Sequence, residues 1–375
     1  LFERCGVSPF GKGIAVTDRT KNILKNLLAL VIGLGLLCTL LCGAELFLRF
    51  RAHEDPKDNH KDFFSYVPEL GWQIKENYSG HHRLRVGTEE IFSVHYEFDA
   101  HHRRITPVTD ADMRQKATLF FGCSFVFGFG VEQEDTLPAF FSRDCTSLLP
   151  INFGSPGYGP QHMWLQIQHP DFFASVPREK GIILYGFIDD HLSRLMGEPN
   201  MVANWGPRLP WLDISEEGVI YKGLMKDRES VFTALRQKLM RLHTGRFILN
   251  RLSLLPVAPY TEEEALQMLV WLLSDVKRKV NELLPGYDLV VFAYPGALRA
   301  AGLGDALEKT GIPFCNYSRL YDGQEAALGQ YYYADAPPNP WGHPKPATYE
   351  KVAALLAKDL AEYCGGDENT IGDTL

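Results

Sequence analysis

The chain has 375 residues, of which 45% are hydrophobic and 22% are charged, a composition typical of one large or two medium folded domains. Its net charge of −8 gives no sign of the basic face that nucleic-acid binding requires, so no nucleic-acid partner is expected. The seven cysteines are scattered without a CxxC pair, which predicts neither a zinc site nor a disulfide framework. The spacing allows at most one incidental disulfide among the last four cysteines, Cys123, Cys145, Cys315 and Cys364.

The first predicted element is a transmembrane helix over residues 27–48. Residues 27–44 contain no charge over 18 positions, which is enough to cross most of a hydrocarbon core. A buried core helix is an alternative, but such helices rarely lack polar residues on every face. A cleaved signal peptide is a second alternative, and "GAELFLRFR" lacks the small-x-small cleavage site that it needs.

The charges beside this helix predict its orientation. Basic residues dominate before the helix, and acidic residues appear soon after it. The basic residues before the helix are Arg4, Lys12, Arg19, Lys21 and Lys25. The charged residues after it are Arg49, Arg51, Glu54, Asp55, Asp58 and Asp62. The positive-inside tendency therefore places residues 1–26 in the cytoplasm. The chain from about residue 52 onward is expected to be extracytoplasmic, in the periplasm if the source is bacterial.

Residues 52–110 are expected to form a polar linker and a small β-rich region. The linker covers about residues 52–66, where charged residues are frequent. Between about residues 71 and 107 the chain has short alternating stretches such as "IFSVHYEFDAHHRRITPV". This alternation predicts a small antiparallel sheet.

Residues 111–365 are predicted to form an α/β domain. Continuous apolar runs at 117–122, 149–154, 181–187 and 288–294 are typical of strands buried on both faces of a parallel sheet. Helical periodicity appears at 160–169, at 261–284 and in the closing segment from residue 348. This alternation predicts a three-layer α/β/α sandwich. Residues 196–258 interrupt it and are expected to be a partly helical insertion that caps a cleft.

Ser124 follows the apolar run 117–122, where a parallel strand is expected to end. Gly122, Gly128 and Gly130 around it permit a tight turn, and a helix is expected to follow. Ligands bind at the carboxyl ends of such strands, and a helix N-terminus supplies free N–H groups for an oxyanion. The local pattern leaves two interpretations open, a nucleophilic serine and a serine that only caps the helix.

Four segments in order along the chain resemble the conserved blocks of the SGNH/GDSL hydrolase superfamily. They are "GCSFVFGFGV", "INFGSPGYGPQ", "ILYGFIDDHLSR" and "WGHPKPATYEKVAALLAKDL", spread over most of the region from 117 to 360. The resemblance implies an SGNH/flavodoxin-like sandwich with Ser124 as nucleophile and His343 as general base. It also implies that Gly157 supplies an oxyanion N–H, with no metal and no organic cofactor.

The chain departs from the family pattern at three positions. Cys123 stands where the family usually has Asp, which should not remove the nucleophile. The acid position three residues before the histidine is Pro340, so either Asp335 or a main-chain carbonyl such as that of Pro340 is expected to orient His343. In the third block Asp189 takes the place of an oxyanion-donating Asn, so it must be protonated or turned away, with His191 as the alternative donor.

These features favour a membrane-anchored serine esterase or deacylase that forms an acyl-serine on a glycan O-acyl or lipid ester. A glycan O-acyltransferase with the same site is one alternative, because only the final acceptor differs. Trp205 and Trp211 in the insertion suit sugar stacking, although such aromatics often only pack. A non-catalytic module that binds glycan or lipid is the other alternative.

Overall fold

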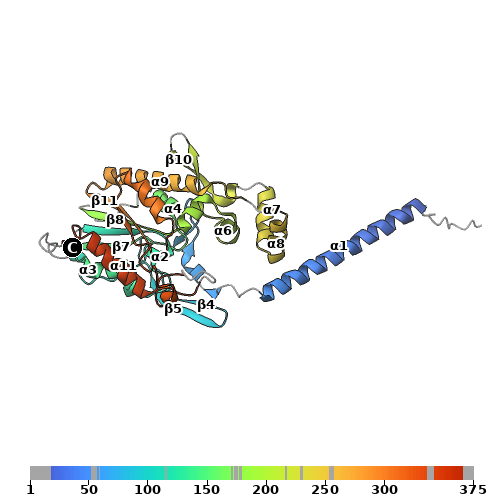
Figure 1. Ribbon diagram of the computed structural model, residues 1–375, viewed down its shortest axis with the longest axis horizontal. Helices are drawn as coiled ribbons and strands as arrows, with labels where there is room; N and C mark the ends of the chain where they lie inside the picture. Colours follow the sequence, from blue (N-terminus) through green and yellow to red (C-terminus); the bar gives the residue numbers. More distant parts are fainter. Residues whose placement is uncertain are drawn as a thin grey trace, which may run out of the picture.

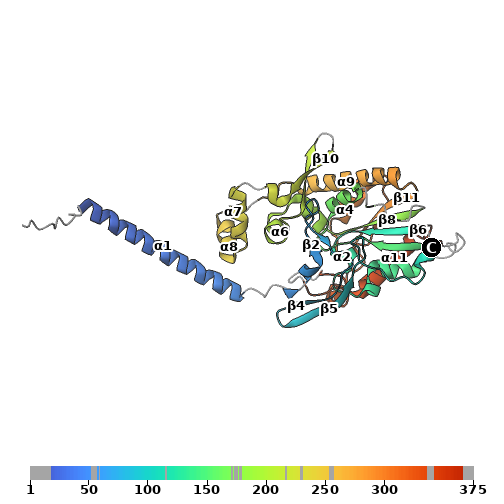
Figure 2. The same cartoon turned by 180° about the vertical axis from the view of Figure 1, so that it is seen from behind.

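Figures 1 and 2 show a body of sheets and helices with one long helix, α1 (Asp18–Arg51), standing apart from it. The structure is a computed structural model. It describes residues 18–51, 57–58, 60–114, 116–169, 172, 176, 180–215, 218–228, 231–252, 257–335 and 342–365.

A five-stranded parallel sheet forms the centre of the body, in the order β12–β11–β8–β6–β7. The four predicted strands are confirmed, since each apolar run contributes one strand that is largely buried. The edge strand β12 is not among the predicted ones, because it has three residues and none of them is fully buried. The strands are β6 (Lys116–Phe121), β7 (Leu148–Asn152), β8 (Gly181–Phe187), β11 (Tyr287–Ala293) and β12 (Phe314–Asn316).

Helices cover both faces of this sheet, which confirms the α/β/α sandwich. Alternate strand residues face opposite sides, so Leu119 and Ile183 pack in one core while Phe120 and Leu184 pack in the other. The first core is closed by α4 (Pro160–Gln168), α5 (Asp190–Met196), α9 (Glu262–Leu283) and α10 (Ala300–Glu308). The second core is closed by α3 (Leu137–Asp144) and α11 (Pro346–Asp359).

The strand order reverses between β6 and β8. The chain passes from β6 to β7 on one side and then places β8, β11 and β12 on the other side of β6. In open α/β sheets, ligands bind outside the carboxyl ends of the strands where the order reverses. Ser124 follows β6 and Asp189 follows β8, so both lie at this point.

The β-rich region is antiparallel, as predicted. Strand β4 (Ser79–Val86) pairs with β5 (Glu89–Glu97) and with β1 (Lys57–Asp58), and β2 (Phe64–Ser65) pairs with β3 (Gln73–Ile74). Short 3₁₀ turns lie at His60–Phe63 and Ala111–Met113. The apolar side of the hairpin packs on Phe127 and Phe129, directly after Ser124. The region therefore supports the turn that carries the candidate nucleophile.

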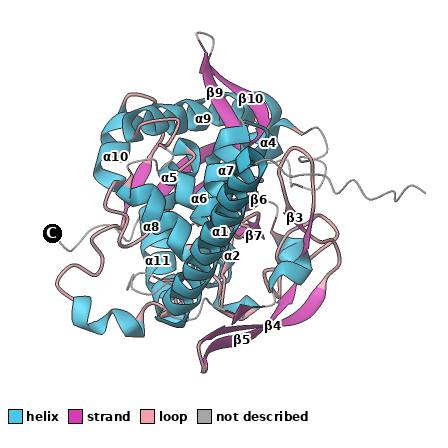
Figure 3. Cartoon of the chain, turned by 90° about the vertical axis from the view of Figure 1, so that its right-hand side faces the viewer, coloured by secondary structure: helices cyan, strands magenta, loops and turns pink. Residues whose placement is uncertain are grey.

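The insertion at 196–258 contains both helices and a β-hairpin. Figures 1 and 3 show the β9–β10 hairpin and the β4–β5 hairpin projecting from opposite ends of the body. The helices α7 and α8 stand on the side from which α1 leaves. The elements of the insertion are α6 (Pro199–Asn204), β9 (Pro210–Ser215), β10 (Gly218–Leu224), a 3₁₀ turn (Met225–Arg228), α7 (Val231–Met240) and α8 (His243–Arg251).

Helix α1 extends beyond the predicted 27–48 span at both ends. Its Arg19–Phe50 segment is long and apolar enough to cross a membrane, with a mean hydropathy of 2.5 in its most apolar window. None of that window is buried against the rest of the chain, which is unlike a core helix of a soluble protein. A signal sequence meets the same criteria of length and composition. Arg4, Lys12, Glu54 and Asp55, used above to predict orientation, lie outside the described residues.

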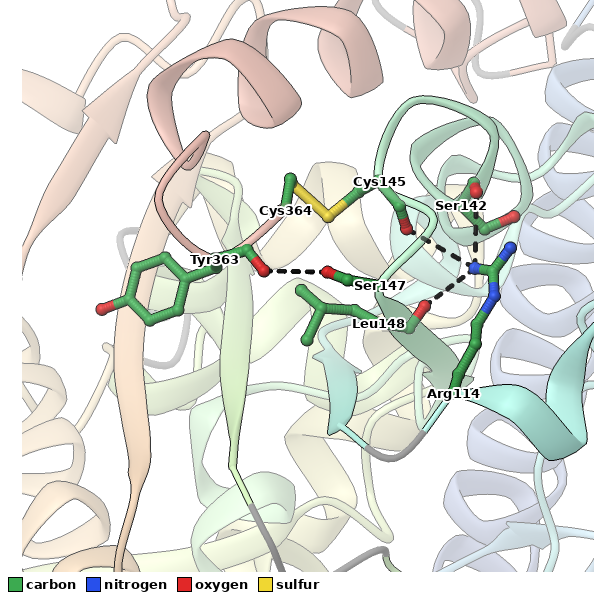
Figure 4. The surroundings of a disulfide bond; sticks show 7 residues. All are labelled: Arg114, Ser142, Cys145, Ser147, Leu148, Tyr363 and Cys364. Atoms are coloured by element: carbon green, nitrogen blue, oxygen red, sulfur yellow. Dashed lines mark hydrogen bonds between the residues drawn. A yellow bond between two sulfur atoms is a disulfide. The ribbon is translucent and has the colours of Figure 1, made fainter. Parts of the chain in front are cut away.

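A disulfide joins Cys145, at the end of α3, to Cys364, after α11 (Figure 4). The same corner is held by two further side chains. Ser147 Oγ donates to the Tyr363 carbonyl at 3.0 Å, and the Arg114 guanidinium donates to the Leu148 carbonyl at 2.9 Å. The bond closes a loop of 219 residues, so it restricts the unfolded chain strongly.

Removing this disulfide is expected to destabilise the body. The Cys145→Ala/Cys364→Ala double variant should lose about 2–4 kcal/mol of unfolding free energy, because the unfolded chain regains the freedom of a long loop. Urea unfolding followed by circular dichroism measures the change. The Cys315→Ala variant is the control, since Cys315 is a free thiol. Equal midpoints for the double variant and the wild type would show that the bond does not form.

Candidate active site

Ser124 begins a single helical turn, α2 (Ser124–Phe127), directly after strand β6. Gly128 ends this turn in the left-handed conformation, with φ of 84°, which is favourable for glycine because it has no Cβ. Its N–H donates to the Ser124 carbonyl at 3.0 Å. The strand end and the short turn together hold Ser124 at the carboxyl edge of the sheet, where it is only 8% exposed.

His343 and Asp335 meet Ser124 from the loop before α11. The Ser124 Oγ and His343 Nε2 atoms are 2.8 Å apart, although the residues are 219 positions apart in the chain. The other ring nitrogen of His343, Nδ1, is hydrogen-bonded to Asp335 Oδ2. The His343 backbone N–H also donates to Asp335 Oδ1 at 3.0 Å. The structure thus brings a hydroxyl, an imidazole and a carboxylate into one hydrogen-bonded chain.

Antiparallel pairing explains how Asp335 reaches a histidine eight residues away. The Tyr333 N–H donates to the His343 carbonyl at 2.9 Å, and the Lys345 N–H donates to the Tyr331 carbonyl at 2.8 Å. These bonds align the segment before Asp335 with the segment around His343. Pro340, whose carbonyl is the alternative orienting group, lies outside the described residues.

The environment of the pair favours an ionised carboxylate. Burial of Asp335 acts to raise its pKa, but the charge of His343 and the hydrogen bonds from His343 outweigh burial and hold the pKa of Asp335 below its ordinary value. The Asp335 side chain is 2% exposed, whereas the His343 side chain is 26% exposed and so faces the open side of the site. The rings of Phe125 and Phe129 lie 5.6 and 4.6 Å from the imidazole and limit its rotation.

A cavity of about 1150 Å³ opens over these residues. Its walls come from the sheet edge, the β-rich region and the insertion together. Ser124, His343 and Asp335 lie on its lining with the two other predicted site residues, Gly157 and Asp189. The β-rich region contributes Phe64, Ser65, Tyr66, Trp72 and Leu84, and the insertion contributes Asn204, Trp205, Pro207 and Arg208. The expectation that the insertion covers a cleft agrees with this placement.

Gly157 follows strand β7 on the cavity wall and must be glycine there. Its φ is 81°, and a Cβ at this position would come within 2.7 Å of the Trp72 ring and 3.3 Å of the Trp205 ring. The Trp72 indole is fixed by its Nε1–H, which donates to the Pro156 carbonyl at 3.0 Å. The Gly157 N–H has no hydrogen-bond partner within the described part of the chain, so it is free to bind a ligand oxygen.

Asp189 lines the cavity, but its carboxylate is bound elsewhere. The carboxylate accepts the N–H groups of Leu298 and Arg299, each at 3.0 Å. Burial raises the pKa of Asp189, against the lowering effect of these two bonds. The side chain is therefore turned toward the loop after β11, which is one of the two conditions expected for it. It shapes the wall formed by that loop.

His191, the alternative oxyanion donor, does not lie on the cavity lining. It is fully buried, and its Nδ1 is 2.7 Å from the Tyr185 hydroxyl. Burial, with the nearby charge of Arg194, lowers its pKa well below the ordinary value. The alternative in which His191 donates to the oxyanion therefore fails, because the first turn of α5 points this ring into the core.

Two buried residues that the sequence reasoning missed hold the Ser124 turn. The Arg104 guanidinium donates to the carbonyls of Phe127 at 3.0 Å and Val131 at 2.6 Å, and it lies 4.5 Å from the centre of the Tyr96 ring. Asn152 Nδ2 donates to the Val126 carbonyl at 3.1 Å. Arg104 occurs in "HHRR", a pattern that indicates solvent exposure, so no local signal marks it.

Among the residues that the structure describes, no group of three or more His, Cys, Asp or Glu side chains is placed to hold a metal ion.

Comparisons with known proteins complete the description of the site. No protein-family model and no curated protein sequence matches the chain. Among solved structures, the chain is similar to a lipolytic protein of the G-D-S-L family from Veillonella parvula, with 10% identity, 65% of this chain and 97% of that chain covered, and a TM-score of 0.36. It is also similar to phospholipase A1 from Streptomyces albidoflavus, with 12% identity, 65% of this chain and 98% of that chain covered, and a TM-score of 0.37. A third similar structure is an acetyl xylan esterase from Butyrivibrio proteoclasticus, with 8% identity, 74% of this chain and 68% of that chain covered, and a TM-score of 0.34. At these levels of similarity, a function for the chain has to rest on the geometry of its own site.

Proposed function

We propose that the chain is a membrane-anchored serine esterase or deacylase in which Ser124, His343 and Asp335 form the catalytic triad. The single observation that carries this proposal is the hydrogen-bonded chain from Ser124 Oγ through the imidazole to the buried carboxylate, at the wall of a large cavity. A serine that only capped a helix would not need a histidine 219 residues away at 2.8 Å.

The proposed reaction begins with attack of Ser124 Oγ on the ester carbonyl carbon while His343 Nε2 takes the hydroxyl proton. The carbonyl oxygen gains negative charge, and the N–H groups of Ser124 and Gly157 stabilise it. The C–O bond to the alcohol then breaks, and the imidazolium returns its proton to the leaving alcohol. Asp335 holds the imidazole tautomer and stabilises the imidazolium. Water then attacks the acyl carbon while His343 takes one of its protons. The bond from that carbon to Ser124 Oγ breaks, the acid leaves, and the imidazolium returns the proton to Oγ.

The cavity supports a substrate larger than a simple short ester. Its volume of about 1150 Å³ exceeds that of a pocket built for a small molecule. Its lining residues include the aromatic Trp72 and Trp205 and the basic Arg194 and Arg208. These groups suit a glycan O-acyl ester or a lipid ester, each of which has a bulky polar part beside the acyl chain.

Two features support an extracytoplasmic body. Helix α1 has the length and composition of an anchor, and more basic residues precede its uncharged run 27–44 than follow that run closely. The Cys145–Cys364 disulfide belongs to an oxidising compartment, because cytosolic reductants keep thiols reduced. Protease treatment of intact cells is expected to remove the body and leave α1 in the membrane. Protection of the body together with cleavage of the N-terminus would show the reverse orientation.

A fluorophosphonate probe tests whether the site is catalytic. The serine oxygen displaces fluoride from the phosphorus of the probe only when a neighbouring base activates the serine, so labelling of Ser124 in the native full chain is expected. The Ser124→Ala variant should not be labelled. If the native chain is not labelled either, the site is a non-catalytic module that binds glycan or lipid, and the esterase proposal fails.

A glycan O-acyltransferase is the second candidate, and the placement of Trp205 favours it. This ring is 46% exposed, lies on the cavity lining and meets Trp72 edge-on, with 6.5 Å between ring centres. Trp211 instead packs against an apolar cluster within the insertion, formed by Met201, Val202, Leu209 and Met225. Incubating the acyl-enzyme with and without an oligosaccharide distinguishes the two activities. Transfer of the acyl group to the sugar in preference to water would favour the transferase.

A further inference from the structure

Helices α7 and α8 carry a charge opposite to that of the chain as a whole. Residues 231–252 contain no Asp or Glu, whereas the whole chain has a net charge of −8. The same residues contain five basic side chains, and all five are exposed: Arg236, Lys238, Arg241, Arg246 and Arg251. This basic surface needs an explanation that the proposed active site does not supply.

Large apolar side chains are exposed between these charges. Phe247 is 68% exposed and Leu252 is 59% exposed. In α8 the buried residues are Gly245 and Leu249, one turn apart, so Phe247 lies on nearly the opposite side of the helix. The apolar residues exposed on the pair are Leu235, Leu239, Leu242, Phe247, Ile248 and Leu252. Helices that lie in a membrane interface expose bulky apolar residues together with Lys and Arg, whose long side chains keep their charges at the headgroups.

The N-terminus of α8 is bonded to the candidate membrane helix. Glu45 of α1 accepts the N–H of His243 at 3.2 Å, and also the N–H and the hydroxyl of Thr244, both at 2.9 Å. Glu45 is the first charged residue after the uncharged run 27–44, so it marks the boundary of the apolar span. Helix α8 therefore begins at the depth where a hydrocarbon core would give way to lipid headgroups.

We propose that the α7–α8 pair lies on the surface of the membrane that α1 spans and binds anionic phospholipids there. The exposed apolar residues enter the headgroup region, and exposed basic side chains such as Lys238 and Arg251 pair with lipid phosphates. This inference rests on the membrane anchor of the proposed function, but not on the esterase activity.

The position of the pair has a consequence for the cavity. Arg241 Nε donates to the Ala203 carbonyl of α6 at 2.9 Å, and Ala203 packs with Met240 and Leu249. The next two residues, Asn204 at the end of α6 and Trp205 directly after it, line the cavity. A membrane-bound α7–α8 pair thus holds this wall, and the opening beside it, close to the lipid surface. Substrates carried in the membrane would reach the active site without leaving the membrane surface.

The test uses the full chain in lipid nanodiscs with a single environment-sensitive fluorophore. Cys5, Cys38, Cys42 and Cys315 are replaced by alanine, while the buried Cys123 and the disulfide pair are kept. The fluorophore is placed through Phe247→Cys on α8. The matched control is Leu283→Cys, an exposed leucine at the end of α9. The discs contain phosphatidylcholine alone or mixed with an equal part of phosphatidylglycerol. Each disc also contains lipids with a nitroxide near the headgroup, which quench a fluorophore that lies in the membrane interface.

Quenching at position 247 in phosphatidylglycerol discs is expected to be about threefold stronger than at position 283. The Lys238→Glu/Arg251→Glu variant should reduce it to the level found in pure phosphatidylcholine, and salt should do the same. The Lys309→Glu/Lys358→Glu variant changes the net charge equally on other exposed surfaces and should leave quenching unchanged. Circular dichroism confirms that each variant is folded.

Three results would overturn the proposal. Equal quenching at positions 247 and 283 would show that α8 lies away from the lipid. Protection of position 247 from an aqueous quencher without quenching by lipid would show that protein, such as a second copy of the chain, covers it. Quenching that stays the same with and without phosphatidylglycerol, and also in the Lys238→Glu/Arg251→Glu variant, would reject recognition of anionic lipid.

The anchor is checked separately with a fluorophore on Cys38, in the middle of α1, after replacement of Cys5, Cys42 and Cys315. Lack of quenching there by nitroxides deep in the acyl chains would refute the anchor and this inference together. Fluorophosphonate labelling of Ser124 in the same samples reports on the active site independently.

Discussion

The Ser124→Ala variant is expected to lose about 10⁵-fold in turnover of a short-chain aryl ester while remaining folded. The substitution removes the atom that would form the acyl intermediate, and the remaining backbone N–H donors supply only a small part of the rate. It also removes one hydrogen bond, to His343 Nε2, so the free energy of unfolding should fall by about 1 kcal/mol or less.

The measurement is kcat on the purified full chain in detergent, with unfolding followed by circular dichroism. Ser142→Ala is the matched control, because Ser142 is also a buried serine with one hydrogen bond but lies in α3, away from the cavity. Its turnover should equal that of the wild type. Retention of most activity by Ser124→Ala would place the nucleophile elsewhere and reject the proposed triad.

The Asp335→Asn variant is expected to lose about 10⁴-fold in turnover. The amide keeps the shape of the side chain but removes the charge that stabilises the imidazolium. Its NH₂ group can also hold His343 in the tautomer that cannot accept the Ser124 proton. If another group oriented the imidazole, the loss would stay within about tenfold, or about 1.4 kcal/mol of barrier.

The matched control is Asp359→Asn, since Asp359 also accepts a hydrogen bond from a side chain, the Tyr317 hydroxyl at 2.8 Å, but does not line the cavity. Turnover of this control should be unchanged. A wild-type to Asp335→Asn ratio near one would leave a Ser124–His343 dyad as the catalytic unit.

The same variant reports on the charge of Asp335 through acid unfolding. Because the folded pKa of Asp335 lies below its ordinary value of 3.8, the folded wild type binds fewer protons there than the unfolded chain as the pH falls past that value. The ionised carboxylate thus contributes stability above about pH 4, and this contribution is lost as the pH falls through the folded pKa. Asp335→Asn lacks it, so its unfolding free energy should fall less steeply with acid than that of the wild type.

Most of the fold follows from patterns within short stretches of sequence. The buried strands appear as continuous apolar runs because both faces of the sheet are covered, and the long helices appear through their apolar periodicity. The run of 18 uncharged residues likewise identifies α1, since every residue of a membrane-spanning segment must suit the hydrocarbon core. Ser124 is recognisable because a strand end and glycine-rich turn are local features too.

The partners of Ser124 are only partly local. His343 appears in the sequence through its resemblance to a family motif, but the choice between Asp335 and a backbone carbonyl remained open there. The bonds from Tyr333 to His343 and from Lys345 to Tyr331 bring Asp335 to the imidazole. Such pairing depends on how two segments of a loop meet, which composition and periodicity do not record.

Contacts between distant segments were decided by the tertiary structure alone. Arg104 and Asn152 support the Ser124 turn from other elements, and Asp189 binds a loop more than 100 residues away. The meeting of Glu45 with Thr244 likewise joins segments 199 residues apart. A residue's local sequence determines its backbone preference and its tendency to be buried. Which buried donor finds which acceptor depends on the packing of the whole chain, because each buried polar group must be paired wherever the fold places it.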